Sequence, residues 1–161
     1  MHRLSLRSLP ALIPVLPLVL VGWIVIGNPA TATADTETTK RDAAIVVHIG
    51  HATDDLHAAS MGMSLARMLQ KKGGRVTVFL DREGVRLADD DMPKDLGWGK
   101  GSDSVRTMLA ELVKAGGRVG LCPHCAMAAG IEEDDLVEGA LILSDDEVAE
   151  LFLNAERVID Y

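Results

Sequence analysis

The feature of the sequence that most constrains the fold is a regular alternation of short apolar runs with longer amphipathic segments. Short runs that are almost continuously apolar and rich in Val, Ile and Leu are typical of strands buried on both faces of a parallel sheet. The predicted strands are residues 43–50, 75–80, 118–122, 139–143 and 157–161. The alternation predicts an α/β fold: a single doubly wound domain over residues 43–161, with a mostly parallel five-stranded sheet flanked by helices.

The segments between the strands carry the start signals and apolar stripes of helices. The expected N-caps are Thr53 or Asp54, Ser102 or Asp103, and Ser144, which forms a capping box with Glu147. The apolar stripe expected on the first helix is Ala58, Met61, Gly62, Leu65, Ala66 and Leu69; the last helix is expected to bury Val148, Leu151 and Phe152. Gly130 is expected to end the helix that begins at Pro123.

Three loops are expected to meet at one edge of the sheet, because the carboxyl ends of parallel strands lie together and form the usual ligand crevice. These loops are residues 51–55, 81–102 and 122–125. His51 and Asp54 are therefore candidate pocket residues. The loop at 81–102 is longer than the roughly 12 to 15 residues above which connections are usually functional or disordered.

The N-terminal residues have the composition of an export signal. Arg3 and Arg7 precede an apolar run, no acidic residue occurs before Asp35, and Ala30–Ala34 offers A-x-A cleavage sites. We predict a signal peptide at residues 1–34 and a flexible leader at 35–42, which implies an exported, periplasmic protein. The alternative is an uncleaved membrane anchor, since the apolar run approaches the roughly 20 residues that span a bilayer; membrane contact is expected only in that case.

The charge of the chain limits its partners. The formal net charge is −8, and removal of residues 1–34, which contain two arginines and no acid, makes it −10. Because nucleic-acid phosphates are bound by Lys and Arg, we expect no nucleic-acid partner.

The two cysteines, Cys122 and Cys125, are the strongest candidates for chemistry. Cys122 ends a predicted strand and Pro123 begins a helix, where unpaired backbone N–H groups and the helix dipole favour a thiolate. We therefore predict Cys122 as the nucleophile and Cys125, one turn later, as the resolving thiol. His124 either donates to a thiolate or faces solvent.

Other interpretations of the cysteine pair remain open at this point. An exported protein can hold two cysteines as a stable disulfide, although the loop between them is too short for much stabilisation. The pair can also serve thiol–disulfide exchange, as the same CPHC motif does in DsbA-like oxidases; only 36 residues follow Cys125 and none is proline, which argues against that fold. The third interpretation is a non-enzymatic metal-binding or adaptor module, with His48, His51, His57, Met61 and Met63 as potential copper ligands, but no complete ligand set is evident.

Residues 44–161 resemble the DsrE/DsrF-like (YchN-like) proteins of sulfur metabolism. The resemblance rests on Cys122 and Gly130 in CPHCAMAAGI, on the following DLVEGALILS, and on VTVFLDREGVRLA around the second strand. It implies a small α/β sulfur-relay domain, a homotrimer or hexamer without a cofactor, in which Cys122 carries sulfur as a persulfide. Cys125 matches a second cysteine found in some branches of the family.

From these features we expect a periplasmic sulfur carrier or sulfurtransferase that accepts sulfur from one molecule or protein and passes it to another. Cys122 would hold the sulfur, and Cys125 would release it or form a disulfide. A thiol–disulfide redox protein and a metal-binding or adaptor module are the alternatives.

Overall fold

A computed structural model of the protein describes residues 42–161. Within them, five strands form one sheet in the order β4-β3-β2-β1-β5, and every neighbouring pair is parallel. The strands are β1 (Ala44–Ile49), β2 (Arg75–Leu80), β3 (Arg118–Leu121), β4 (Ala140–Ile142) and β5 (Arg157–Asp160). The predicted α/β fold with a parallel five-stranded sheet is confirmed. The predicted signal peptide (1–34) lies outside the described residues, as does the leader (35–42) apart from Asp42.

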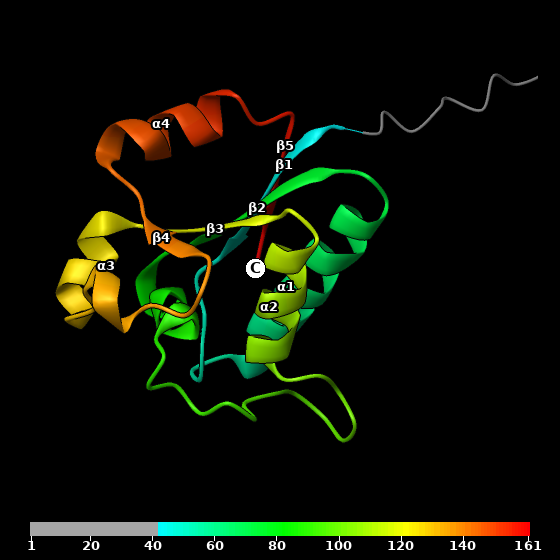
Figure 1. Cartoon of the computed structure of the whole chain (residues 1–161), viewed down its shortest axis with the longest axis vertical. Coiled ribbons are helices and arrows are strands. Elements are labelled where there is room, and N and C mark those ends of the chain that lie inside the picture. The colour runs from blue at the N-terminus through cyan, green and yellow to red at the C-terminus, as the bar shows by residue number, and fades with distance from the viewer. Residues whose placement is uncertain (1–41) are drawn as a thin grey trace, which may run out of the picture. The chain divides into compact units, whose positions relative to one another are not determined.

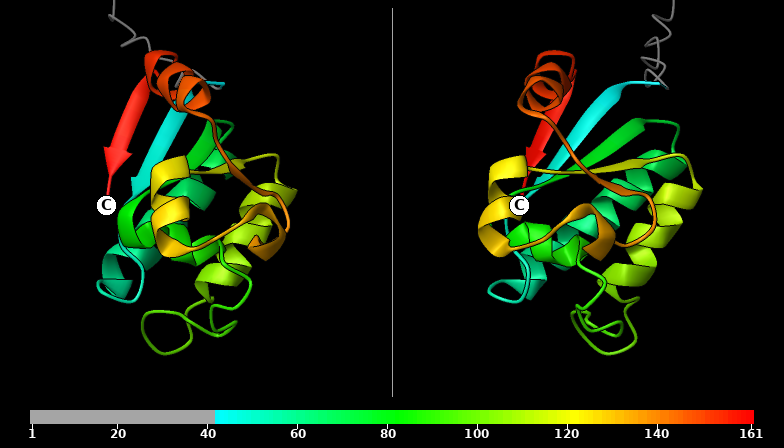
Figure 2. Two further views of the ribbon diagram at one scale, coloured as in Figure 1. Left: turned by 90° about the vertical axis from the view of Figure 1, so that its left-hand side faces the viewer. Right: turned by 60° about the vertical axis from the view of Figure 1, so that its left-hand side comes forward.

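The helices lie on both faces of the sheet (Figure 1). They are α1 (Leu56–Lys71), α2 (Val105–Lys114), α3 (Pro123–Ala129) and α4 (Asp145–Leu153), together with the short 3-10 helices η1 (Arg82–Ala88) and η2 (Glu133–Asp135). Helices α1 and α2 pack side by side on one face. Helix α4 lies towards the N-terminal ends of the strands, whereas α3 and η1 lie towards their carboxyl ends (Figure 2).

The two faces of the sheet are buried to different extents. The α1/α2 face holds a large apolar core that includes Val47, Val78 and Leu121, none of which is exposed. The α4 face holds only a small cluster of Val46, Phe79 and Leu143, which α4 partly covers. No residue of α4 itself is fully buried, so the predicted burial of its apolar stripe is realised only in part.

Several predicted details of the helices differ from the structure. The N-cap of α1 is Asp55, and that of α2 is Ser104; each side chain accepts a backbone N–H three residues later. The predicted stripe of α1 was wrong at Met61, which is 41% exposed, because the helix turns Ala59, Met63 and Ala66 towards the sheet. The predicted capping box of α4, Ser144 with Glu147, is present.

Gly84 is the point of closest approach between η1 and β1. A Cβ atom at this position would lie 2.1 Å from the backbone carbonyl oxygen of Ile49. Real Cβ atoms do not approach a carbonyl oxygen so closely, so only glycine allows η1 to lie against the end of β1. This contact fixes the loop that follows β2 at the carboxyl edge of the sheet.

None of the helices between residues 42 and 161 has the length and apolar character needed to cross a membrane.

Candidate functional site

Cys122 stands at the junction between β3 and α3, as predicted. It is the N-cap of α3, Pro123 follows it in the first turn, and Gly130 ends the helix with a φ of 72°. The Cys122 N–H donates to the carbonyl of Leu80 at 2.8 Å, which ties the residue to the end of β2. The β3–α3 turn therefore presents Cys122 at the carboxyl edge of the sheet.

The side chain of Cys122 lies on the α4 face. It is half-buried and packs against the small cluster of Val46, Phe79 and Leu143. This side chain accepts no capping hydrogen bond from the first N–H groups of α3. The activation of the thiol by these helix amides, which the sequence suggested, therefore lacks a direct hydrogen bond. The surroundings of the sulfur are mainly apolar.

Cys125 is the second half-buried thiol, and neither cysteine forms a disulfide. Burial raises the pKa of Cys125, and its hydrogen bond with Cys122 raises the pKa further. The backbone N–H of Arg82 acts in the opposite direction by donating to the Cys125 sulfur. The two thiols are thus in direct contact, and Cys125 retains its proton over a wider pH range than an ordinary thiol.

The raised pKa of Cys125 leads to a direct test. Because only the thiolate reacts with iodoacetamide, the alkylation rate of Cys125 should reach half its maximum at a higher pH than that of free cysteine. Site-resolved mass spectrometry over a pH series measures this rate for Cys125 separately from Cys122. A midpoint at or below that of free cysteine would contradict the assignment of Cys125 as the proton-retaining thiol.

Arg82 connects the cysteine pair to the loop after β2. Its backbone has a φ of 46°, in the left-handed region that non-glycine residues rarely adopt. Its Nε atom donates to Oδ1 of Asp81 at 3.0 Å, and this bond is the main cause of the raised pKa of Arg82. The guanidinium packs against Gly50, where a Cβ atom would lie 2.0 Å from Nη2. Strained backbone of this kind is concentrated at functional sites.

His48 lies between two carboxylates at the ends of three neighbouring strands. Its Nδ1 atom bonds to Asp160, and its Nε2 atom is 2.8 Å from Oδ1 of Asp81. The His48 Nε2 and Asp81 Oδ1 atoms are within ion-pair distance but are not aligned as a hydrogen bond. In the described part of the chain, Nε2 is therefore buried without a hydrogen-bond partner. Contacts therefore run from Cys125 through Arg82, Asp81 and His48 to Asp160.

The other predicted pocket residues lie apart from this chain of contacts. His51 Nδ1 and Asp54 Oδ2 are 2.7 Å apart. The backbone N–H of Ala52, and then His51, lower the pKa of Asp54 to about 2. His124 is exposed and its Nε2 lies 3.0 Å from Oδ1 of Asp145, so it faces solvent and α4. The structure gives none of the three a contact with a cysteine.

Asp81, Arg82 and Asp160 were not among the predicted site residues, and His48 was considered only as a potential copper ligand. The available signal was their position: each lies at or just beyond the carboxyl end of a predicted strand. Over residues 42–161, no group of three or more His, Cys, Asp or Glu side chains is arranged to hold a metal ion.

Comparisons with known proteins agree with the fold. The sequence model of the DsrE/DsrF-like family matches residues 43–161. The ychN protein from E. coli has a similar structure, with a TM-score of 0.64 and 23% sequence identity, over 74% of this chain and 99% of that one. MTH1491 from Methanobacterium thermoautotrophicum, a protein of unknown function, aligns with a TM-score of 0.57 and 22% identity, over 74% and 100% of the two chains. The comparison with curated proteins gave no match.

Proposed function

Because the chain belongs to the DsrE/DsrF-like family, which is linked to sulfur relay, we propose that it is a sulfur carrier that binds sulfane sulfur as a persulfide on Cys122. The observation that carries the proposal is the contact between two half-buried thiols at the carboxyl edge of the sheet. Cys125 retains its proton and is a hydrogen-bond donor for the sulfur of Cys122. This arrangement favours Cys122 as the nucleophile of the pair.

Loading is a nucleophilic displacement at sulfur. The Cys122 thiolate attacks a sulfane sulfur of a donor such as polysulfide. A new S–S bond forms on Cys122, the S–S bond in the donor breaks, and the shortened donor leaves as an anion. The apolar contacts of Cys122 with Val46, Phe79 and Leu143 limit the access of water to the new bond.

The sulfane sulfur leaves Cys122 by one of two routes. In the first, an acceptor thiolate attacks the outer sulfur, and Cys122 leaves as a thiolate without net oxidation of the protein. In the second, the Cys125 thiolate attacks the inner sulfur, hydrosulfide leaves, and a Cys122–Cys125 disulfide forms; the two cysteines are then oxidised and the sulfane sulfur is reduced to sulfide. The second route requires Cys125 to lose its proton, and the backbone N–H of Arg82 assists this loss.

The location and partners of the carrier form part of the proposal. The signal-like composition of residues 1–34 supports export to the periplasm. Sulfur donors and acceptors there would be small sulfur compounds or other proteins. The family resemblance supports a homotrimer or hexamer.

A second candidate function is thiol–disulfide exchange, which the direct contact of two free thiols also favours. Intact-mass analysis of the purified, reduced protein after incubation with polysulfide separates the two functions. A carrier gains one sulfur atom, about 32 Da, whereas an exchanger loses two hydrogens, about 2 Da, and gains no sulfur. Treatment with a reductant should restore the original mass in both cases. Because the second delivery route also ends in a disulfide, loss of two hydrogens by the wild-type protein overturns the carrier proposal only if the Cys125→Ser variant, which cannot form that disulfide, gains no sulfur under the same conditions.

A further inference from the structure

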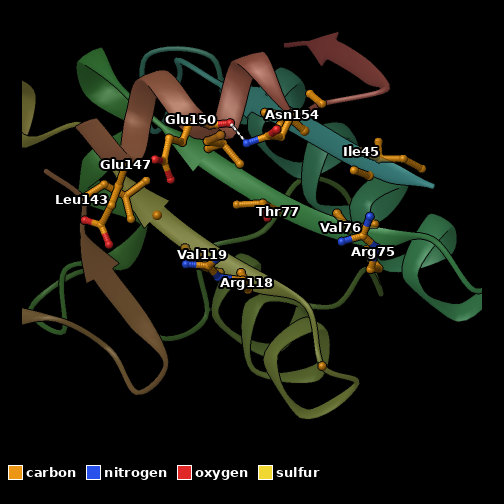
Figure 3. Close-up of a pocket in the computed structure, with 16 residues that line it drawn as sticks. Ile45, Arg75, Val76, Thr77, Arg118, Val119, Leu143, Glu147, Glu150 and Asn154 are labelled. Atoms are coloured by element: carbon orange, nitrogen blue, oxygen red, sulfur yellow. Dashed lines mark hydrogen bonds between the residues drawn. The ribbon is translucent and has the colours of Figure 1, made fainter. Parts of the chain in front are cut away.

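A cavity of about 410 Å³ lies between α4 and the sheet, towards the N-terminal ends of β1, β2 and β3 (Figure 3). Its size is within the range of roughly 300 to 1,000 Å³ that is usual for small-molecule sites. It shares Val46, Leu143 and Leu151 with the apolar cluster that Cys122 contacts. The cavity is nevertheless distinct from the cysteine site, since neither cysteine lines it.

The floor of the cavity is formed by the sheet and is apolar. Thr77 and Gly120 line the floor, and both residues are too small to fill the space below α4. At Gly120 a Cβ atom would lie 2.6 Å from Cδ1 of Leu143, so the glycine lets Leu143 pack directly on β3. The floor therefore offers an apolar surface to a ligand.

The walls of the cavity carry opposite charges, as Figure 3 shows. Arg75 and Arg118 begin β2 and β3 on the sheet side, and Glu147 and Glu150 extend from α4 on the other side. Arg75 is paired with Asp42, and Glu147 accepts from Ser144. By contrast, the side chain of Glu150 has no hydrogen bond or ion pair within residues 42–161, and that of Arg118 has only a coulombic interaction with Glu147, without a hydrogen bond or a close ion pair in the same residues.

We propose that this cavity binds a small zwitterion of the amino-acid or short-peptide type. Its carboxylate would pair with Arg118, its ammonium group with Glu150, and its apolar part would lie on the floor. A ligand with only one charge would pair with one wall and leave the other wall without a partner. Charge complementarity thus selects a molecule whose two charges are separated by an apolar stretch.

The test compares three probes by isothermal titration calorimetry with the purified protein. The probes are 6-aminohexanoate, which carries both charges, and hexanoate and hexylammonium, which carry one each. We expect 6-aminohexanoate to bind more tightly than either analogue by up to about fivefold, since one exposed ion pair contributes up to a factor of about five.

Two substitutions test which residue binds each charged group of the probe. Arg118→Gln should weaken 6-aminohexanoate and hexanoate by about fivefold and leave hexylammonium unchanged, and Glu150→Gln should weaken 6-aminohexanoate and hexylammonium instead. Arg157→Gln is the matched control. Arg157 also begins a strand and is exposed, but it does not line the cavity. Thr77→Leu, which fills the floor, should abolish binding of all three probes while circular dichroism remains unchanged.

Three results would overturn the proposal. The first is equal affinity for the three probes, the second is binding that survives Thr77→Leu in the folded variant, and the third is the absence of binding altogether. If Arg118→Gln changes the sedimentation coefficient of the protein and not its affinity for the probes, the cavity is part of a contact between copies of this chain, and the ligand proposal is wrong.

Discussion

The Cys122→Ser variant is expected to gain no sulfur when it is incubated with polysulfide under conditions in which the wild-type protein gains about 32 Da. A serine hydroxyl is not ionised near neutral pH and cannot form a persulfide, so loading should fall by at least about a hundredfold. Intact-mass analysis gives the loaded fraction directly. The fold should be unaffected, because the Cys122 side chain makes no capping hydrogen bond that serine would lose.

Cys125→Ser is the matched variant. It lies three residues later in the same helix, is also half-buried, and retains Cys122. We expect it to load sulfur and to hold the persulfide longer than the wild-type protein, because no second thiol can displace hydrosulfide from Cys122. If Cys122→Ser still loads and Cys125→Ser does not, the roles of the two cysteines are reversed.

Gly84→Ala is expected to cause the largest loss of stability among single substitutions outside the main core. The new Cβ would lie 2.1 Å from the backbone oxygen of Ile49, which no rotamer change relieves. Either β1 or η1 must move, and overpacking of this kind costs roughly 1 to 3 kcal/mol, so we expect a loss of about 3 kcal/mol because the clash is with backbone. Urea-induced unfolding followed by circular dichroism measures the change.

Gly99→Ala is the control for the loss of glycine itself. Gly99 has a φ of 85° and no atom within 4 Å of an added Cβ, so only the left-handed backbone is penalised, by about 1 kcal/mol. The difference between the two variants isolates the clash with Ile49. Equal destabilisation of the two variants would show that η1 does not lie tightly against β1.

Strands β1, β2 and β3 could be predicted from the sequence because most of their residues are buried, whereas β4 and β5 lie at the edges of the sheet and are more exposed. An almost unbroken apolar run such as that of residues 44–49 is compatible with few other structures. The capping box at Ser144 and the helix end at Gly130 depend on local hydrogen bonds or on one backbone angle, and the structure contains both.

The orientation of α1 could not be predicted because it depends on a tertiary contact. Its sequence contains two overlapping apolar stripes, one through Met61 and one through Met63. The contact of Gly62 with β1 selects the second: a Cβ at Gly62 would lie 2.9 Å from the Ile49 side chain. The helix therefore approaches the sheet at this glycine and turns Met63 inwards.

The residues that Arg82 links to Cys125 were missed for a related reason. His48, Asp81 and Asp160 are each separated from the others by more than 30 residues of sequence. They meet only because β1 pairs with β2 on one side and with β5 on the other, with His48 opposite both Phe79 and Asp160. Strand order and register, which composition does not encode, bring them together.

The partly buried helix α4 lies over both the proposed ligand cavity and the apolar cluster that contacts Cys122. Leu151 lines the cavity and also belongs to the apolar cluster that contacts Cys122. A molecule bound beneath α4, as proposed above, would contact side chains that also pack around Cys122. Any such coupling is reciprocal. If a ligand in the cavity changes the equilibrium constant for sulfur loading by some factor, sulfur loading changes the affinity of the cavity for that ligand by the same factor.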